Sequence, residues 1–192
     1  LADLASSICS SAAVPSRLRI LAGLLGRAAG DGEDAAVKLT GGLRRLLVAF
    51  VTEQLEKMRH LPVSSEAARA ALQHILETAL AQIQALARKL GKASGKKRAS
   101  REALVDGLCT CVSTLEGLVD PPAYLRVLVA LAGSGSSDET AARSLRLITE
   151  KVESFGRDTE GTVSRAERAQ LSEAAEAALA LGGDGCQSLL SS

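Results

Sequence analysis

The sequence predicts an all-α fold built from stacked helical hairpins. Apolar residues recur at helical spacing in several segments, and no run of alternating β-branched and polar residues is long enough for a strand. Apolar residues make up 46% of the 192-residue chain, but aromatic residues make up only 2%. The core must therefore consist of Leu, Ala, Val and Ile, and this choice favours helices over strands.

The segment 121–155 shows the hairpin unit most clearly. Pro121 and Pro122 suit the first turn of a helix, where the N–H group is not needed. Residues 133–135 end this apolar run, and a second apolar stripe then extends to Phe155. Each helix is apolar along one side only, so the pair must stack on neighbouring hairpins. This is the architecture of HEAT and armadillo α-solenoids, whose period is about 35 to 47 residues. A compact helical bundle would show the same stripes.

Three helices are expected before residue 60. A weak one covers residues 1–11, and Pro15 opens a second that ends before Gly30. The third covers residues 35–59, where Gly41-Gly42 should kink or split it, because each glycine inside a helix costs about 1 kcal/mol relative to alanine. The apolar stripe of the second helix is Leu18, Leu21, Leu25 and Ala28, and that of the third is Leu43, Leu46, Leu47, Phe50, Val51, Leu55 and Met58.

Besides the hairpin at 121–155, three more helices are expected after residue 60. The longest covers residues 66–90 and is capped by Ser64 or Ser65. Ser100 should cap the next helix, which ends near Asp120, and Ser164 begins a capping box for the last. The two apolar stripes before Asp120 are Leu72, Leu76, Ala79, Ile83, Leu86 and Leu90, and then Leu104, Leu108, Val112, Leu115 and Val119.

These elements predict one helical-repeat (HEAT-like) region at residues 1–182, with a basic linker at 91–100 and a frayed tail at 183–192. Because the sequence begins with Leu1 and not with Met, we expect a fragment of a longer chain.

Net charge and cysteine spacing argue against several classes of function. The net charge is +1, and no apolar run approaches the roughly 20 residues that span a bilayer, so a membrane partner is not expected. Of the four cysteines, Cys109 and Cys111 would point about 200° apart on a helix, which is poor geometry for one metal. We interpret all four as small apolar residues and expect no cofactor or metal.

The basic linker is the one stretch that suggests direct contact with a partner. Residues 89–101 hold six basic residues and no acidic one. Such a cluster can neutralise phosphates or an acidic protein surface, can serve as a nuclear localisation signal, or can be a solvated linker. No aromatic residue is interleaved, so base stacking is not predicted. The candidate contact residues for RNA or an acidic partner are Lys92, Lys96, Lys97, Arg98 and Arg101.

No catalytic constellation is visible. His60 and His74 are far apart in sequence, and neither has the neighbours of a catalytic triad. The glycine pairs at 23–26 and 133–135 follow no strand, so dinucleotide and P-loop sites are excluded. We therefore expect neither an enzyme nor a small-molecule substrate.

Two segments resemble units of the very large HEAT-repeat scaffold family of the small-subunit processome, which is associated with the U3 small nucleolar RNA. In residues 115–152, a helix end is followed by a proline corner, the pair Tyr124-Leu125 and an acidic turn at 138–139. In residues 14–26, a proline and basic residues precede a Leu-rich helix that ends in glycine.

The resemblance implies a nucleolar, non-enzymatic scaffold in pre-rRNA processing and small-subunit assembly. Its partners would be other processome proteins, with pre-rRNA or small nucleolar RNA held through phosphate contacts. The alternatives are a HEAT or armadillo protein-binding adaptor in transport or chromatin, and a compact bundle with a cofactor or lipid groove.

Overall fold

The computed structural model describes residues 13–29, 39–59, 65–90 and 93–132, together with three single positions near residue 170. The chain divides into two compact units, and the boundary between them in the sequence falls between Val119 and Asp120. The described residues contain helices and no strand, which confirms the all-α prediction for this part of the chain.

Some predicted elements lie outside the described residues. They are the helix at 1–11, the second half of the hairpin 121–155 and the tail at 183–192. In the helix predicted from Ser164, the described positions are helical, and they are Ala169, Ser172 and Glu176.

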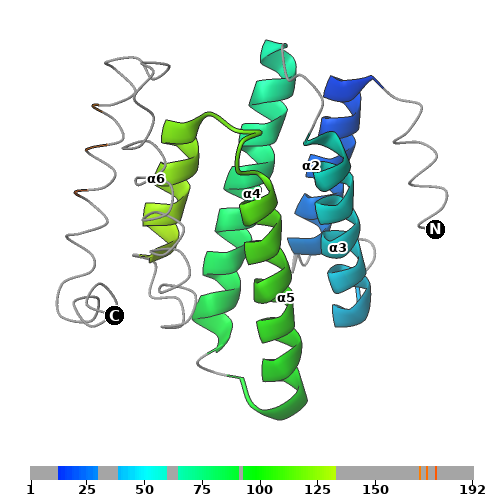
Figure 1. The fold of residues 1–192 in the computed structure, drawn as a ribbon. Helices are drawn as coiled ribbons and strands as arrows, with labels where there is room; N and C mark the ends of the chain where they lie inside the picture. Colours follow the sequence, from blue (N-terminus) through cyan, green and yellow to red (C-terminus); the bar gives the residue numbers. More distant parts are fainter. Residues whose placement is uncertain are drawn as a thin grey trace. The chain divides into compact units, whose positions relative to one another are not determined.

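Five helices have defined bounds, and the first four of them form the first unit (Figure 1). The predicted pair Gly41-Gly42 opens α3 and does not interrupt it. Thr40 caps this helix, because its hydroxyl oxygen accepts a hydrogen bond of 3.3 Å from the Leu43 N–H. Ser65 caps α4 in the same way through the Ala68 N–H, at 3.2 Å. The helices are α2 Val14–Ala29, α3 Gly41–Met58, α4 Glu66–Leu90, α5 Gly95–Thr114 and α6 Pro121–Ala132.

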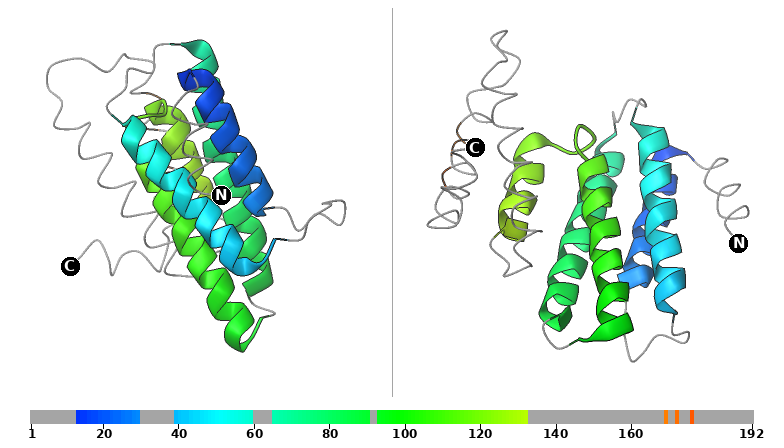
Figure 2. Two further views of the ribbon diagram at one scale, coloured as in Figure 1. Left: turned by 90° about the vertical axis from the view of Figure 1, so that its right-hand side faces the viewer. Right: turned by 60° about the horizontal axis from the view of Figure 1, so that its bottom comes forward.

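The first unit consists of two antiparallel helix pairs, α2 with α3 and α4 with α5, packed side by side. Helix α2 packs on α4, and α3 packs on α5. Figures 1 and 2 show that α2 and α4 run in one direction and α3 and α5 in the other. Helices from different pairs are thus parallel neighbours, unlike those of an up-and-down bundle, where all neighbours are antiparallel.

The spacing of equivalent helices is longer than predicted. Helix α2 begins at Val14 and α4 at Glu66, 52 residues later, while α3 begins at Gly41 and α5 at Gly95, 54 residues later. The predicted period of about 35 to 47 residues is therefore too short for this unit. The connection at residues 30–40 lengthens the first spacing, the 25-residue length of α4 lengthens the second, and the 18-residue length of α3 contributes to both.

The core is formed by the predicted stripes of α2, α4 and α5 and by the second half of the α3 stripe, where Val51, Leu55 and Met58 are buried. The stripe residues of α2 and α5 are all buried, and so are the first four of α4. The stripe predicted for α3 is wrong in its first half, because Leu43 is 38% and Leu46 67% exposed. Leu46 lies two residues from the buried Val48, and therefore about 200° around the helix from the side that packs on the other helices.

Helix α5 begins five residues before the predicted start at Ser100. Residues 95–100 are thus helical, and the linker predicted at 91–100 is wrong over this part. Ser94 is the N-cap, and Gly95 has a φ of 56°, which glycine adopts without a steric cost. Lys, Arg and Ala are good helix formers, and the exposed ion pair between Arg98 and Glu102 at 2.7 Å adds local support.

Two buried glutamines tie α2 to its neighbours. Gln54 of α3 accepts a hydrogen bond of 3.2 Å from the Arg17 guanidinium. Gln82 of α4 donates from Nε2 to the Leu25 carbonyl oxygen at 2.7 Å. Because a buried polar group is costly without a partner, these bonds favour one position of α2 over others.

Small residues allow α3 and α5 to approach closely. A Cβ atom added at Gly41 would lie 2.7 Å from the Ser100 hydroxyl oxygen, and one added at Gly107 would lie 3.3 Å from Cγ1 of Val48. Glycine therefore occupies both positions where the backbone of one helix meets a side chain of the other.

In the second unit, the described residues are Asp120, helix α6 and the three single positions named above. The Tyr124 N–H donates to the Asp120 carbonyl oxygen at 3.0 Å, which closes the first turn. The apolar residues Tyr124, Leu125, Leu128 and Leu131, which recur at helical spacing, are buried. Over the described residues, no helix has the length and apolarity required to cross a bilayer.

We expect Leu55→Ala to lower the free energy of unfolding by about 2 to 5 kcal/mol, because Leu55 is fully buried and its loss leaves a cavity. Leu46→Ala, on the same helix, should change it by less than about 0.5 kcal/mol, because Leu46 is largely exposed. Urea denaturation followed by circular dichroism measures both. Equal losses would contradict the orientation of α3.

Candidate functional site: the basic end

Helices α2 and α4 end, and α3 and α5 begin, at the same end of the first unit (Figures 1 and 2). The terminal turns at this end are rich in Arg and Lys. Among the described residues of these terminal turns, Glu102 is the one acidic side chain. The sequence between α2 and α3, which lies outside the described residues, adds three acidic residues and one basic residue. We call this end the basic end, and its described cations are Arg27, Arg44, Arg45, Arg88, Lys89, Lys96, Lys97, Arg98 and Arg101.

The five candidate residues from the sequence have different environments. Lys96 and Lys97 are exposed in the first turn of α5 and make no hydrogen bond or ion pair with a described residue. Arg98 pairs with Glu102, as noted above. Arg101 donates from Nη1 to the Lys89 carbonyl oxygen at 2.6 Å and so fastens α5 to the end of α4. Lys92 lies outside the described residues.

The cations that other helices bring to the basic end were not among the predicted contact residues. Arg44 and Arg45 follow the start of α3, which touches α5 through Gly41 and Ser100. The bond from Arg101 brings the end of α4 to the same place. The sequence shows that these helix termini are rich in Arg and Lys. Whether the termini lie at the same end of the unit depends on how the helices pack.

Helix dipoles strengthen the positive potential of the basic end. Both α3 and α5 present their N-termini here, and neither has an acidic residue in its first turn. A cation at the positive end of a helix is unfavourable by about 0.3 to 1 kcal/mol. Ser94 is the N-cap of α5, and its own side chain makes no cap hydrogen bond. A helix N-terminus with cations beside it suits a phosphate or another anion.

The described cysteines are not placed for chemistry at this end. Cys109 and Cys111 are free and buried, which confirms for these two the prediction of small apolar residues. Burial raises the pKa of Cys111 to about 11, although a hydrogen bond with Thr52 opposes the shift. The described part of the chain holds no group of side chains suited to a metal ion, and His74 is exposed on α4.

Comparisons with models of protein families, with curated proteins and with solved structures find no match to this chain.

The raised pKa of Cys111 predicts a loss of stability at high pH. The unfolded thiol, with a pKa near 9.0, ionises before the buried one. The contribution of Cys111 to stability is therefore complete below pH 9 and lost as the pH rises toward 11, by at most about 1.4 kcal/mol per pH unit. Urea denaturation of the wild type and of Cys111→Ala between pH 8 and pH 10.5 should show their difference shrinking as pH rises. Parallel curves would contradict the burial of this thiol.

Proposed function

We propose that this chain is a non-enzymatic HEAT/armadillo-like α-solenoid scaffold that holds RNA by its phosphates at the basic end. The assembly that we propose for it is the small-subunit processome in the nucleolus, on the resemblance of residues 14–26 and 115–152 to that scaffold family. In that assembly it would support pre-rRNA processing and ribosome assembly by presenting a large binding surface to its partners, and it would not catalyse a reaction.

The packing order of the helices supports the solenoid. Two successive hairpins are stacked so that each helix lies beside its equivalent, α2 on α4 and α3 on α5, as in helical-repeat proteins. The side of α3 that faces away from α5 carries the exposed Leu43 and Leu46. An apolar surface of this kind is expected where a hairpin stacks on another element.

The gathering of cations from four helices is the observation that carries the RNA-binding proposal. A net charge of +1 for the whole chain gives no reason to expect a polyanion, but the charge is unevenly distributed. The opposite end of the first unit mixes both signs, with Glu53, Glu56 and Glu66 beside Lys57 and Arg59. Phosphate contacts from the basic end would provide affinity without sequence specificity.

Alanine substitution of Lys96 and Lys97 tests RNA binding without disturbing the fold, because neither side chain makes a hydrogen bond or an ion pair with another described residue. The matched control is Arg19→Ala/Arg69→Ala, which removes two exposed cations near the starts of α2 and α4. Binding to a single-stranded RNA of about 20 nucleotides is measured across salt concentrations. The Lys96→Ala/Lys97→Ala double variant should reduce the slope of log K against log salt by about 1.4, since each phosphate contact contributes about 0.7. An unchanged slope, or an equal change in the control, would reject the basic end as an RNA site.

The proposed assembly is tested in cells. The tagged full-length protein should sediment with precursors of the small ribosomal subunit and recover pre-rRNA and processome proteins. Recovery of transport or chromatin proteins without pre-rRNA would favour the alternative, a HEAT or armadillo adaptor, and would reject the processome assignment.

A further inference from the structure

Ser100 lies in the basic end, after three consecutive cations and one alanine. Lys96, Lys97 and Arg98 stand four, three and two positions before it, and Ala99 directly precedes it. Among all the serines and threonines of the sequence, Ser100 is the one with a basic residue at each of these three positions. Basophilic protein kinases recognise this pattern, because acidic residues near their catalytic site bind the cations that precede the acceptor hydroxyl.

The hydroxyl group of Ser100 is available for modification. Ser94, and not Ser100, is the N-cap of α5. Ser100 is half-buried, and its hydroxyl makes no hydrogen bond with another described residue. Its neighbour across the contact between the helices is Gly41, where an added Cβ atom would lie 2.7 Å from the hydroxyl oxygen. Glycine at this position therefore leaves beside the oxygen a space that any other residue would fill.

The start of α5 is weakly held, which favours the opening that a kinase requires. A kinase binds the acceptor segment in extended form, so the first turns of α5 must unfold locally. The N-cap side chain makes no hydrogen bond, the first turn has no acidic residue, and its cations face the positive end of the helix dipole. The contacts that oppose the opening, from Arg98 to Glu102 and from Arg101 to Lys89, both involve exposed groups and are therefore weak.

A phosphate on Ser100 would lie beside two lysines of its own helix. Side chains on a helix lean toward its N-terminus, and residues three and four positions apart are neighbours on its surface. The phosphate therefore reaches Lys96 and Lys97, which are exposed and make no hydrogen bond or ion pair with a described residue.

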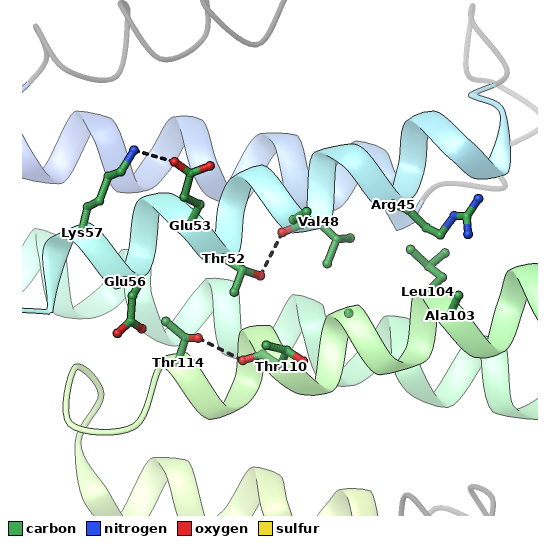
Figure 3. Close-up of a pocket in the computed structure, with 12 residues that line it drawn as sticks. Arg45, Val48, Thr52, Glu53, Glu56, Lys57, Ala103, Leu104, Thr110 and Thr114 are labelled. Atoms are coloured by element: carbon green, nitrogen blue, oxygen red, sulfur yellow. Dashed lines mark hydrogen bonds and ion pairs between the residues drawn. The ribbon is translucent and has the colours of Figure 1, made fainter.

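Helix α3 brings a further cation to the same place. Figure 3 shows Arg45 on α3 opposite Leu104 on α5, with its guanidinium group extended toward the start of α3. Arg45 follows Gly41 by one turn, and Leu104 follows Ser100 by one turn. The guanidinium group thus extends toward the point where Ser100 meets Gly41, so a phosphate there would have cations of both helices around it.

From these observations, we propose that Ser100 is phosphorylated by a basophilic protein kinase and that the phosphate lowers the affinity of the basic end for RNA. The second part rests on the proposed function. In the reaction, the Ser100 hydroxyl oxygen bonds to the γ-phosphorus of ATP, and the bond from that phosphorus to the oxygen that bridges it to the β-phosphate breaks. ADP leaves, and the hydroxyl proton passes to a carboxylate of the kinase.

The charge of the added group explains its effect on RNA. A phosphoserine carries a charge of about −1.5 to −2 at pH 7. It therefore neutralises about two cations of the basic end and competes with RNA phosphates for them.

The first experiment locates the modification. The full chain is incubated with ATP, Mg²⁺ and the catalytic subunit of cyclic-AMP-dependent protein kinase, and mass spectrometry should find one phosphate, at Ser100. Ser100→Ala should abolish incorporation. Ser94→Ala is the matched control and should leave incorporation unchanged, because Ser94 is exposed near the start of α5 but lacks the three preceding cations.

A synthetic peptide of residues 94–104 serves as an extended substrate and should react faster than the protein, because it needs no opening. Reaction of the peptide without reaction of the protein, reaction of neither, or phosphate at other positions in place of Ser100 would overturn the proposal.

The second experiment compares binding to the same single-stranded RNA before and after phosphorylation. The slope of log K against log salt should fall by about 1.4, since loss of two phosphate contacts removes about 0.7 each. Phosphatase treatment should restore the slope, and Ser100→Ala treated with the kinase should keep the slope of the untreated wild type. An unchanged slope in the phosphorylated wild type would reject the second part of the proposal.

A third measurement reports the surroundings of the phosphate without RNA. ³¹P NMR follows its second ionisation, whose pKa is about 6 when no partner is near. Neighbouring cations lower this pKa, so the phosphate should titrate at lower pH in the native chain than in the same chain in urea. Equal titration would overturn the placement of the phosphate among the cations. Failure of the unmodified protein to bind RNA would reject the proposed function and the second part with it, while the location and titration of the phosphate would still decide the first part.

Discussion

The close parallel contact between α3 and α5 determines the surface that we consider functional. Two helices approach this closely because Gly41 faces the Ser100 side chain and Gly107 faces the Val48 side chain, so that at each point only one of the two helices places a side chain between the backbones. Parallel alignment places both N-termini, with their dipoles and cations, at one end of the unit. The same contact places Ser100 beside Gly41, within the basic end. The basic end and its proposed modification site therefore both follow from one packing constraint.

The basic end differs in charge from the opposite end of the first unit, which mixes both signs. The basic end offers cations from four helices, which attract phosphates without reading a sequence. Buried polar bonds from Gln54 and Gln82 to α2 help to keep the hairpins in a single arrangement, so the relative positions of these helix termini are fixed by the core.

Much of the fold was predictable because local signals agreed with each other. Helix α4 has Ser65 at its cap and a regular apolar stripe, and both bounds of the helix match the prediction. Pro121 likewise marked the start of α6. The start of α5 was missed, because glycine, serine and lysine also characterise a linker, and only the structure shows that Gly95 makes a turn from which the helix continues. The first half of the α3 stripe was misassigned, because Leu43 and Leu46 look like core residues in any sequence pattern.

The sequence alone determined that this chain is helical, that its helices are apolar along one side, and that Lys96 and Lys97 belong to a cationic stretch. These properties follow from neighbours along the chain, which hydrophobic periodicity and capping residues report directly. Only the tertiary structure decided that Arg44 and Arg45 join that stretch, that Arg101 is engaged by the end of α4, and that α3 and α5 are in close contact. The reason is that these features depend on which helices pack together and in which direction, and apolar stripes alone do not specify a partner.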